Sequence, residues 1–143
     1  MTSAIQGSCL CGSVRFECQI NQLPLKIYQC HCTLCKKQSG SSSNSGIILK
    51  AEQFKWLAGE SDIQAWKKQS GFSAHFCKTC GSPVPNLFAN AYYWLPVGLF
   101  EDITAEVVAN LCLDNQSNWH VLADTARNFN DLPEFSELMK LLS

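Results

Sequence analysis

The chain carries little charge of either sign and has few histidines. Of its 143 residues, 11 are Lys or Arg, 12 are Asp or Glu and 3 are His, so the formal net charge at neutral pH is -1. Proteins that bind nucleic acids need a basic excess to neutralise phosphates. We therefore expect no nucleic-acid partner.

Long apolar runs are missing as well. The residues Met1 to Gly7 contain neither a charged leader nor an apolar stretch long enough for export, and no later run is long enough to span a membrane. These absences predict a cytoplasmic protein with no membrane partner. Because 46% of the residues are hydrophobic, a chain of this length is expected to form one domain, 1–143, with its own core.

Cysteine, by contrast, is abundant. The sequence has nine cysteines, and in a reducing compartment clustered thiols are more often metal ligands or redox groups than disulfides. Cys18 and Cys112 stand alone in apolar runs, where we expect them to pack as small hydrophobic side chains. The other seven form three clusters: Cys9 and Cys11; Cys30, Cys32 and Cys35; Cys77 and Cys80.

The hydrophobic pattern predicts a mainly β fold. Val14, Phe16, Cys18 and Ile20 alternate with polar residues, as in a half-buried strand. Only the end of the chain has helical spacing, which predicts a short C-terminal helix after Pro133. Further β-leaning runs lie at 25–28, 45–49, 54–57, 62–66, 72–76, 92–97 and 106–113, and a polar loop is expected at 40–46.

The spacing within the clusters suits a metal. Side chains at i and i+2 of an extended segment point to the same side, so Cys9 with Cys11, and Cys30 with Cys32, can each offer two thiolates to one ion. Residues 77–81 follow the Cys-x-x-Cys-Gly pattern of a zinc knuckle, in which glycine permits a tight turn beneath the metal. These turns favour zinc, although tetrathiolate iron remains an alternative.

Seven clustered cysteines do not divide by four. A closed tetrahedral site from Cys9, Cys11, Cys77 and Cys80 would leave the other three cysteines with an open position, as in catalytic zinc sites. Alternatively, a histidine completes the second site and both sites are structural. The candidates for that fourth ligand are His31, His75 and His120.

Three stretches resemble a known family. The residues 7–14 (GSCLCGSV), 30–40 (CHCTLCKKQSG) and 76–83 (FCKTCGSP) are similar in order and in neighbours to the glutathione-dependent formaldehyde-activating enzyme family, also known from its centromere protein V member. The similarity continues through 96–98 to Trp119 and thus covers nearly the whole chain.

The resemblance implies a β-tent zinc-binding fold and two zinc ions. It implies a structural zinc on Cys9, Cys11, Cys77 and Cys80, and a catalytic zinc on Cys30, Cys32 and Cys35. The family's named activity is the S-(hydroxymethyl)glutathione synthase reaction, which joins formaldehyde to glutathione and is a carbon-sulfur lyase reaction when written backwards. The expected partner is therefore a small thiol, glutathione or another.

One stretch in the C-terminal part of the chain departs from the family pattern. Relatives often have a Ser-Lys-Ala-Pro-Trp-like stretch where this chain has Asn115-Gln116-Ser117-Asn118-Trp119, so a lysine and a proline are replaced. Lys36 or Lys37 can offset the charge of three thiolates and meet a substrate carboxylate. The aromatic candidates for a pocket wall are Trp119, Trp94, Tyr92 and Tyr93, and the candidate acids are Glu60, Asp62, Asp114 and Asp124.

Three functional hypotheses remain at this point. The first is a zinc enzyme of the carbon-sulfur lyase type, and the second is a non-catalytic, zinc-stabilised binding or scaffold module. A third is redox cycling of Cys32 and Cys35 as a dithiol, although the extra Cys30 favours a metal. Fold alone does not distinguish them.

Overall fold

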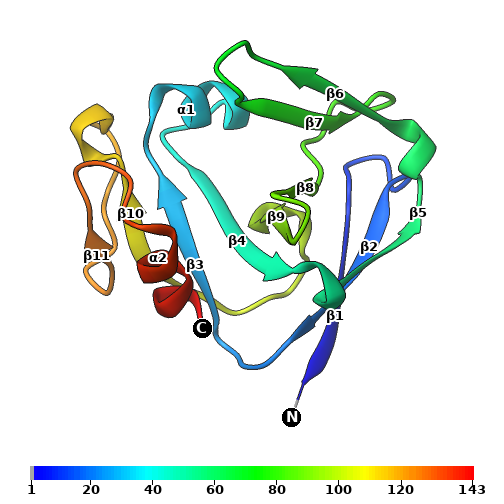
Figure 1. Cartoon of the computed structure of the whole chain (residues 1–143), viewed down its shortest axis with the longest axis horizontal. Helices are drawn as coiled ribbons and strands as arrows, with labels where there is room; N and C mark the ends of the chain where they lie inside the picture. Colours follow the sequence, from blue (N-terminus) through cyan, green and yellow to red (C-terminus); the bar gives the residue numbers. More distant parts are fainter. Residues whose placement is uncertain (1) are drawn as a thin grey trace. The chain divides into compact units, whose positions relative to one another are not determined.

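The computed structural model describes residues 2–143 and confirms a mainly β fold with a short C-terminal helix (Figure 1). The two α-helices are α1 (Thr33–Ser39) and α2 (Phe135–Leu142). The strands are β1 (Ser3–Ser8), β2 (Arg15–Ile20), β3 (Leu25–Cys30), β4 (Asn44–Lys50), β5 (Phe54–Ala58), β6 (Ile63–Lys67), β7 (Ser73–Cys77), β8 (Asn86–Phe88), β9 (Tyr92–Pro96), β10 (Ala105–Leu111) and β11 (Arg127–Asn128).

The described residues form two compact units. The first unit comprises the chain through Gln22 together with Ile48–Ile103, and the second comprises Leu23–Ile47 together with Thr104–Ser143. Each unit is therefore discontinuous in sequence. A single domain over 1–143 stays a prediction.

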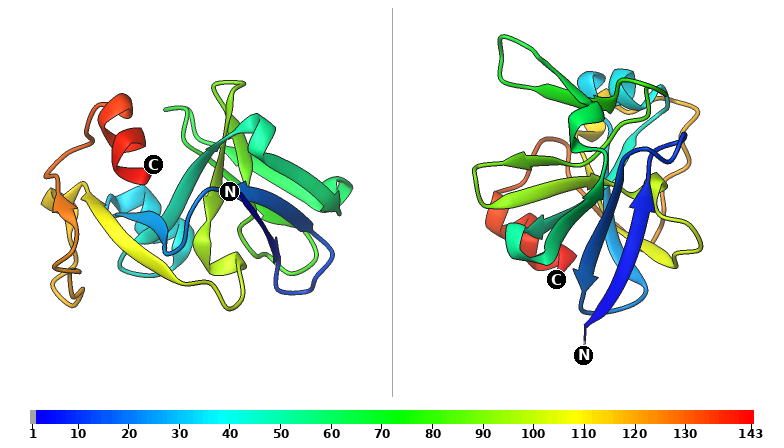
Figure 2. Two further views of the ribbon diagram at one scale, coloured as in Figure 1. Left: turned by 90° about the horizontal axis from the view of Figure 1, so that it is seen from below. Right: turned by 90° about the vertical axis from the view of Figure 1, so that its right-hand side faces the viewer.

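The first unit is built on a three-stranded antiparallel sheet in the order β1-β2-β5. The right-hand view of Figure 2 shows β1 and β2 side by side. The alternation predicted for β2 is confirmed, since Phe16, Cys18 and Ile20 are buried. Phe16 is the centre of this core: its ring stacks on Phe54 at 5.6 Å and meets the ring of Phe100 edge-on at 5.5 Å.

Two hairpins complete the first unit. β6 pairs with β7 and β8 pairs with β9, both antiparallel. The end of β7 is buried at Cys77, and Val84 just before β8 is fully buried as well. Both residues pack in one apolar cluster with Cys9 and Val14. The first and third cysteine-rich stretches therefore meet in this unit.

The second unit is organised around two parallel strands. β10 pairs in parallel with β3, with Leu111 opposite Cys30, while the start of β4 runs antiparallel on the other side of β3. The short strand β11 adds to β10, and α2 packs on β3 and β10. Because parallel strands end at the same edge of a sheet, Cys30 and the residue after Leu111 come to the same place.

Most predicted strands are confirmed, but the sequence pattern did not predict the helix α1 or the strands β1, β8 and β11. The strands β1, β8 and β11 carry no strong alternation, and β11 has only two residues. The expectation that only the C-terminus is helical is wrong, because α1 follows directly on the second cysteine cluster. Within the described residues, no helix combines the length and apolarity needed to cross a membrane.

Candidate metal centres

Two similar turns hold the first group of cysteines. In one, the Gly12 N–H donates to the carbonyl of Cys9 at 3.1 Å, and in the other the Gly81 N–H donates to the carbonyl of Cys77 at 2.7 Å. Both glycines have left-handed backbone, with φ of 81° and 79°. Glycine adopts this conformation without steric cost, so each turn can close tightly around its two thiols. The predicted knuckle at 77–81 is thus present, and residues 9–12, which read Cys-x-Cys-Gly, form a glycine turn that is one residue shorter.

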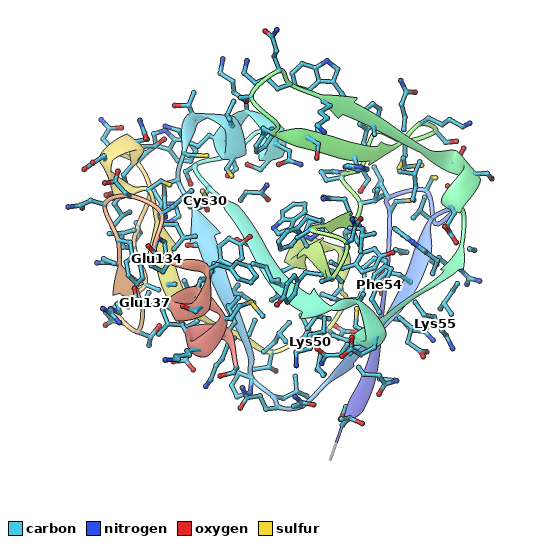
Figure 3. All side chains as sticks on the ribbon, viewed as in Figure 1. Cys30, Lys50, Phe54, Lys55, Glu134 and Glu137 are labelled. Carbon is cyan, nitrogen blue, oxygen red and sulfur yellow. The ribbon has the colours of Figure 1, made fainter. Side chains whose placement is uncertain are left out.

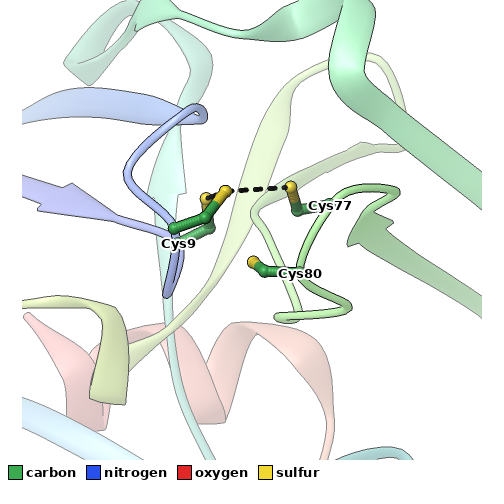
Figure 4. Close-up of side chains that lie close together, drawn as sticks. Cys9, Cys77 and Cys80 are labelled. Atoms are coloured by element: carbon green, nitrogen blue, oxygen red, sulfur yellow. Dashed lines mark hydrogen bonds between the residues drawn. The ribbon is translucent and has the colours of Figure 1, made fainter.

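The four sulfur atoms of this group are arranged as a metal would need them. The sulfurs of Cys9, Cys11, Cys77 and Cys80 all lie within 4.8 Å of one another. Cys11 Sγ is 3.7 Å from Cys9 Sγ and 3.8 Å from Cys77 Sγ, while a tetrahedron with Zn–S arms of about 2.3 Å has edges of about 3.8 Å. Figure 4 shows the sulfurs of Cys9, Cys77 and Cys80 turned toward one another. The group therefore fits a closed tetrathiolate site.

A polar network surrounds the same group. The hydroxyls of Ser13 and Thr79 each donate to Asp62 Oδ2 at 2.8 Å, and Ser13 Oγ also lies 3.2 Å from Cys11 Sγ. These two hydrogen bonds hold the pKa of Asp62 below its usual range. Asp62, one of the candidate acids, thus fixes the loops around the first group. The position of Ser13 in the sequence does not indicate this role, because the role depends on its long-range contact with Asp62.

The second group lies where β3 ends and α1 begins, at the top of β3 in Figure 3. The sulfurs of Cys30, Cys32 and Cys35 lie within 4.8 Å of one another. Cys32 is the N-cap of α1, and its sulfur accepts a hydrogen bond from the Cys35 N–H at 3.3 Å. Among the described residues, no histidine joins either group at this distance. The second group therefore has three sulfur ligands to offer.

The pKa is lowered for two thiols of the first group, Cys9 and Cys80, and for Cys30 in the second group; for Cys80 the main cause is a hydrogen bond from the Ser82 backbone. Burial would raise the pKa of Cys9, but hydrogen bonds from the Val14 N–H, from Ser13 and from neighbouring thiols outweigh it and bring the pKa to about 6. A hydrogen bond from Cys35 is the main cause that lowers the pKa of Cys30 to about 6, while the pKa of Cys35 is raised. Thiolates, not thiols, bind metals. Both groups are chemically suited to a metal ion.

The two lone cysteines differ from each other. Cys18 is fully buried, as predicted for a packing residue, and burial raises its pKa to about 12. Cys112 is only partly buried, and burial is the main cause that raises its pKa to about 12. It follows directly on β10, whose parallel pairing with β3 places Leu111 opposite Cys30.

His31 stands between two cysteines of the second group in sequence and does not belong to the group itself. Its side chain is fully buried, and Nε2 lies 3.0 Å from Asn110 Oδ1. Asn110 Nδ2 donates to Asn128 Oδ1 at 3.1 Å, so the amide oxygen faces His31, and His31 Nε2 donates. This bond anchors the backbone between Cys30 and Cys32.

A second imidazole lies against His31. The rings of His31 and His120 are perpendicular, with centroids 4.5 Å apart. Ser42 Oγ is 2.6 Å from His120 Nδ1, while His31 Nδ1 and His120 Nε2 are buried without a hydrogen-bond partner among the described residues. Burial, and then the neighbouring His31, lower the pKa of His120. The neutral form of His120 is therefore favoured.

The two candidate lysines have different surroundings. Lys36 Nζ donates to the carbonyl of Asn115 at 2.7 Å and lies 3.4 Å from Ser117 Oγ. It thereby ties α1 to the segment that replaces the family's lysine-containing stretch. Lys37 is exposed on the same helix.

The predicted aromatic pocket wall is only partly found. A cavity of about 340 Å³ lies in the first unit and is lined by Trp56, Tyr93 and His75, among others. Tyr93 is the one member of the predicted wall in this lining, whereas Trp119 is 66% exposed in the second unit.

Comparison with known proteins agrees with this geometry. A crystal structure of a Rhodobacter sphaeroides protein is similar in fold, with a TM-score of 0.57 and 18% sequence identity over 69% of this chain and 90% of that chain. The family model described as "Glutathione-dependent formaldehyde-activating enzyme" matches residues 4–113, which include all seven clustered cysteines. The chain belongs to the glutathione-dependent formaldehyde-activating enzyme family.

Proposed function

We propose that the chain is a zinc-dependent enzyme of the carbon-sulfur lyase type that resembles S-(hydroxymethyl)glutathione synthase. The observation that supports this most is the unequal number of sulfurs in the two groups. Four sulfurs at tetrahedral spacing satisfy a structural zinc, whereas three leave a position for another ligand. We assign the structural zinc to Cys9, Cys11, Cys77 and Cys80, and the catalytic zinc to Cys30, Cys32 and Cys35.

The reaction joins a thiol to a small carbonyl compound. The substrate sulfur forms a bond to the carbonyl carbon, the C=O π bond breaks, and the thiol proton ends on the new hydroxyl oxygen. For glutathione and formaldehyde the product is S-(hydroxymethyl)glutathione. A zinc ion at the second group supplies positive charge that favours the thiolate form of a bound thiol.

The chain's own residues position this reaction. His31 and Asn110 fix the backbone between two of the three cysteines, and Lys36 fixes the segment at 115–117 beside α1. Three thiolates on a divalent ion leave a formal charge of -1, which opposes a further anion. Lys37, exposed on α1, offers a positive charge that offsets this and can meet a substrate carboxylate.

The test compares a change in each group. Cys35→Ser should lose one zinc per chain and all turnover of formaldehyde with glutathione above the uncatalysed rate, while the circular dichroism spectrum is kept. Cys77→Ser should lower the thermal stability, because structural zinc contributes directly to folding. Cys18→Ala removes a thiol from neither group and should keep both zinc ions and the turnover.

Zinc content by elemental analysis, before and after a mild chelator, completes the experiment. One readily removed zinc whose loss abolishes turnover supports the enzyme. Two tightly held zinc ions without turnover would support a zinc-stabilised binding or scaffold module instead. Activity only in the metal-free, dithiol form would point to redox cycling.

A further inference from the structure

The cavity in the first unit contains no member of either cysteine group. Its volume is about 340 Å³, and its lining comes from the strands β5 to β9 and from the turn Glu60–Asp62. Sites for small molecules in proteins are concave, mostly apolar and about 300–1,000 Å³ in volume. The cavity therefore has the size of a site for a small ligand.

Two aromatic rings form adjoining walls of this cavity. The rings of Trp56 and Tyr93 are nearly perpendicular, at 82°, with centroids 6.2 Å apart. Phe54 supports both rings: it stacks on Tyr93 at 4.0 Å and meets Trp56 edge-on at 4.8 Å. Because the rings are held in place before any ligand arrives, binding between them requires little rearrangement.

The only charged side chain in the lining is negative. Glu60 lines the cavity, and its carboxylate makes no ion pair within the described chain. No Lys or Arg among the described residues is part of the lining. The lining residues Ile63, Pro85 and Leu87 are apolar, so acceptors for N–H donors are few. A primary ammonium group, which has three N–H donors, would leave donors unpaired in such a site.

We propose that this cavity binds a small organic cation with a methylated ammonium head group. The positive charge of such a head group is spread over methyl groups, which pack against ring faces and need no hydrogen-bond acceptor. A cation in the angle between Trp56 and Tyr93 lies within the roughly 6 Å over which a ring attracts it. Glu60 supplies the opposite charge. No zinc ion, thiol or turnover enters this proposal, so it stands apart from the proposed function.

Nuclear magnetic resonance on the zinc-loaded full chain at low ionic strength tests the proposal. The probes are choline and dimethylbutanol, its uncharged carbon isostere. Choline should bind at least about fivefold more tightly, because the rings and the carboxylate favour the charge. Its methyl protons should show nuclear Overhauser effects to the rings of Trp56 and Tyr93. Equal affinities, contacts to the exposed Trp66 or Trp119 instead, or the absence of saturable binding would overturn the proposal.

Glu60→Gln keeps the shape of the side chain and removes its charge. It should weaken the binding of choline several-fold and leave the binding of dimethylbutanol unchanged. Glu52→Gln is the matched control, because Glu52 is exposed in the same unit and does not line the cavity. Equal losses in the two variants would show a general effect of net charge and would overturn the role of Glu60.

Tyr93→Leu replaces the ring by an apolar side chain without a π face. It should lower the ratio of the two affinities, and this ratio is insensitive to a moderate loss of stability. An unchanged ratio would overturn the contribution of the Tyr93 ring.

A peptide that contains trimethyllysine carries the same head group as choline. It should bind no more tightly than choline, because a cavity of this size takes the head group and little else. Markedly tighter binding of the peptide would overturn the assignment to a free small molecule. Turnover is not part of any of these readouts, so a failure of the proposed function is recognised separately.

Discussion

Gly59 packs against the backbone of Ser13 and Val14, the loop that follows the first cysteine pair. Gly59→Ala should therefore destabilise the fold and weaken zinc binding at the first group. Gly59 has φ of 86°, and a Cβ there would collide with the Ser13 carbonyl oxygen and come within 2.7 Å of Val14 Cα. These contacts are backbone atoms, which cannot move aside as a flexible side chain can. Val14 in turn donates its N–H to Cys9 Sγ at 3.3 Å. A shift of this loop therefore displaces a thiolate ligand.

The cost can be separated into two parts. An alanine in a sparsely populated backbone region costs about 1–3 kcal/mol, and forcing extra atoms into a packed site costs a further 1–3 kcal/mol or so. Gly71→Ala is the matched control, because Gly71 has φ of 102° but nothing within 4 Å of the added Cβ. The two variants should therefore differ by about 1–3 kcal/mol, which is the cost of the collision alone.

Urea unfolding at a fixed zinc concentration measures this difference, since bound zinc adds to the stability. Gly59→Ala should have a lower midpoint than Gly71→Ala and should release its structural zinc faster to a chelator. Equal midpoints for the two variants, with equal zinc release, would refute the reasoning that the loop at 13–14 has no room to move.

Two further predictions concern the core and the histidine pair. Phe16→Ala should destabilise the chain by about 3–5 kcal/mol in urea unfolding, because the fully buried ring contacts the rings of Phe54 and Phe100; a loss below 1 kcal/mol would contradict its place in the core. Burial lowers the pKa of His120 in the folded chain, so the unfolded chain binds the His120 proton more readily. The free energy of unfolding is therefore unaffected by this group above about pH 6.5 and decreases as the pH falls toward the lowered pKa of the folded chain. His120→Gln should therefore flatten the stability profile between about pH 7 and pH 5, and an unchanged slope would contradict this assignment.

Local patterns allowed the cysteine groups to be identified from sequence. Ligands at i and i+2, or in a Cys-x-x-Cys turn, are near each other in almost any backbone, so the pairs themselves could be predicted. That Cys9 and Cys11 meet Cys77 and Cys80 depends on long-range packing. The number of cysteines suggested that pairing as one division of the seven, and the family resemblance supported it.

The missed helix shows a different limit. α1 has seven residues, too few for hydrophobic periodicity to appear. Its end was nevertheless marked, because Lys36 and Lys37 lie in its last turn and Gly40 follows in left-handed conformation. The thiol of Cys32, which caps the start of α1, was interpreted as a metal ligand or a redox thiol and not as a helix cap. One side chain can serve both purposes.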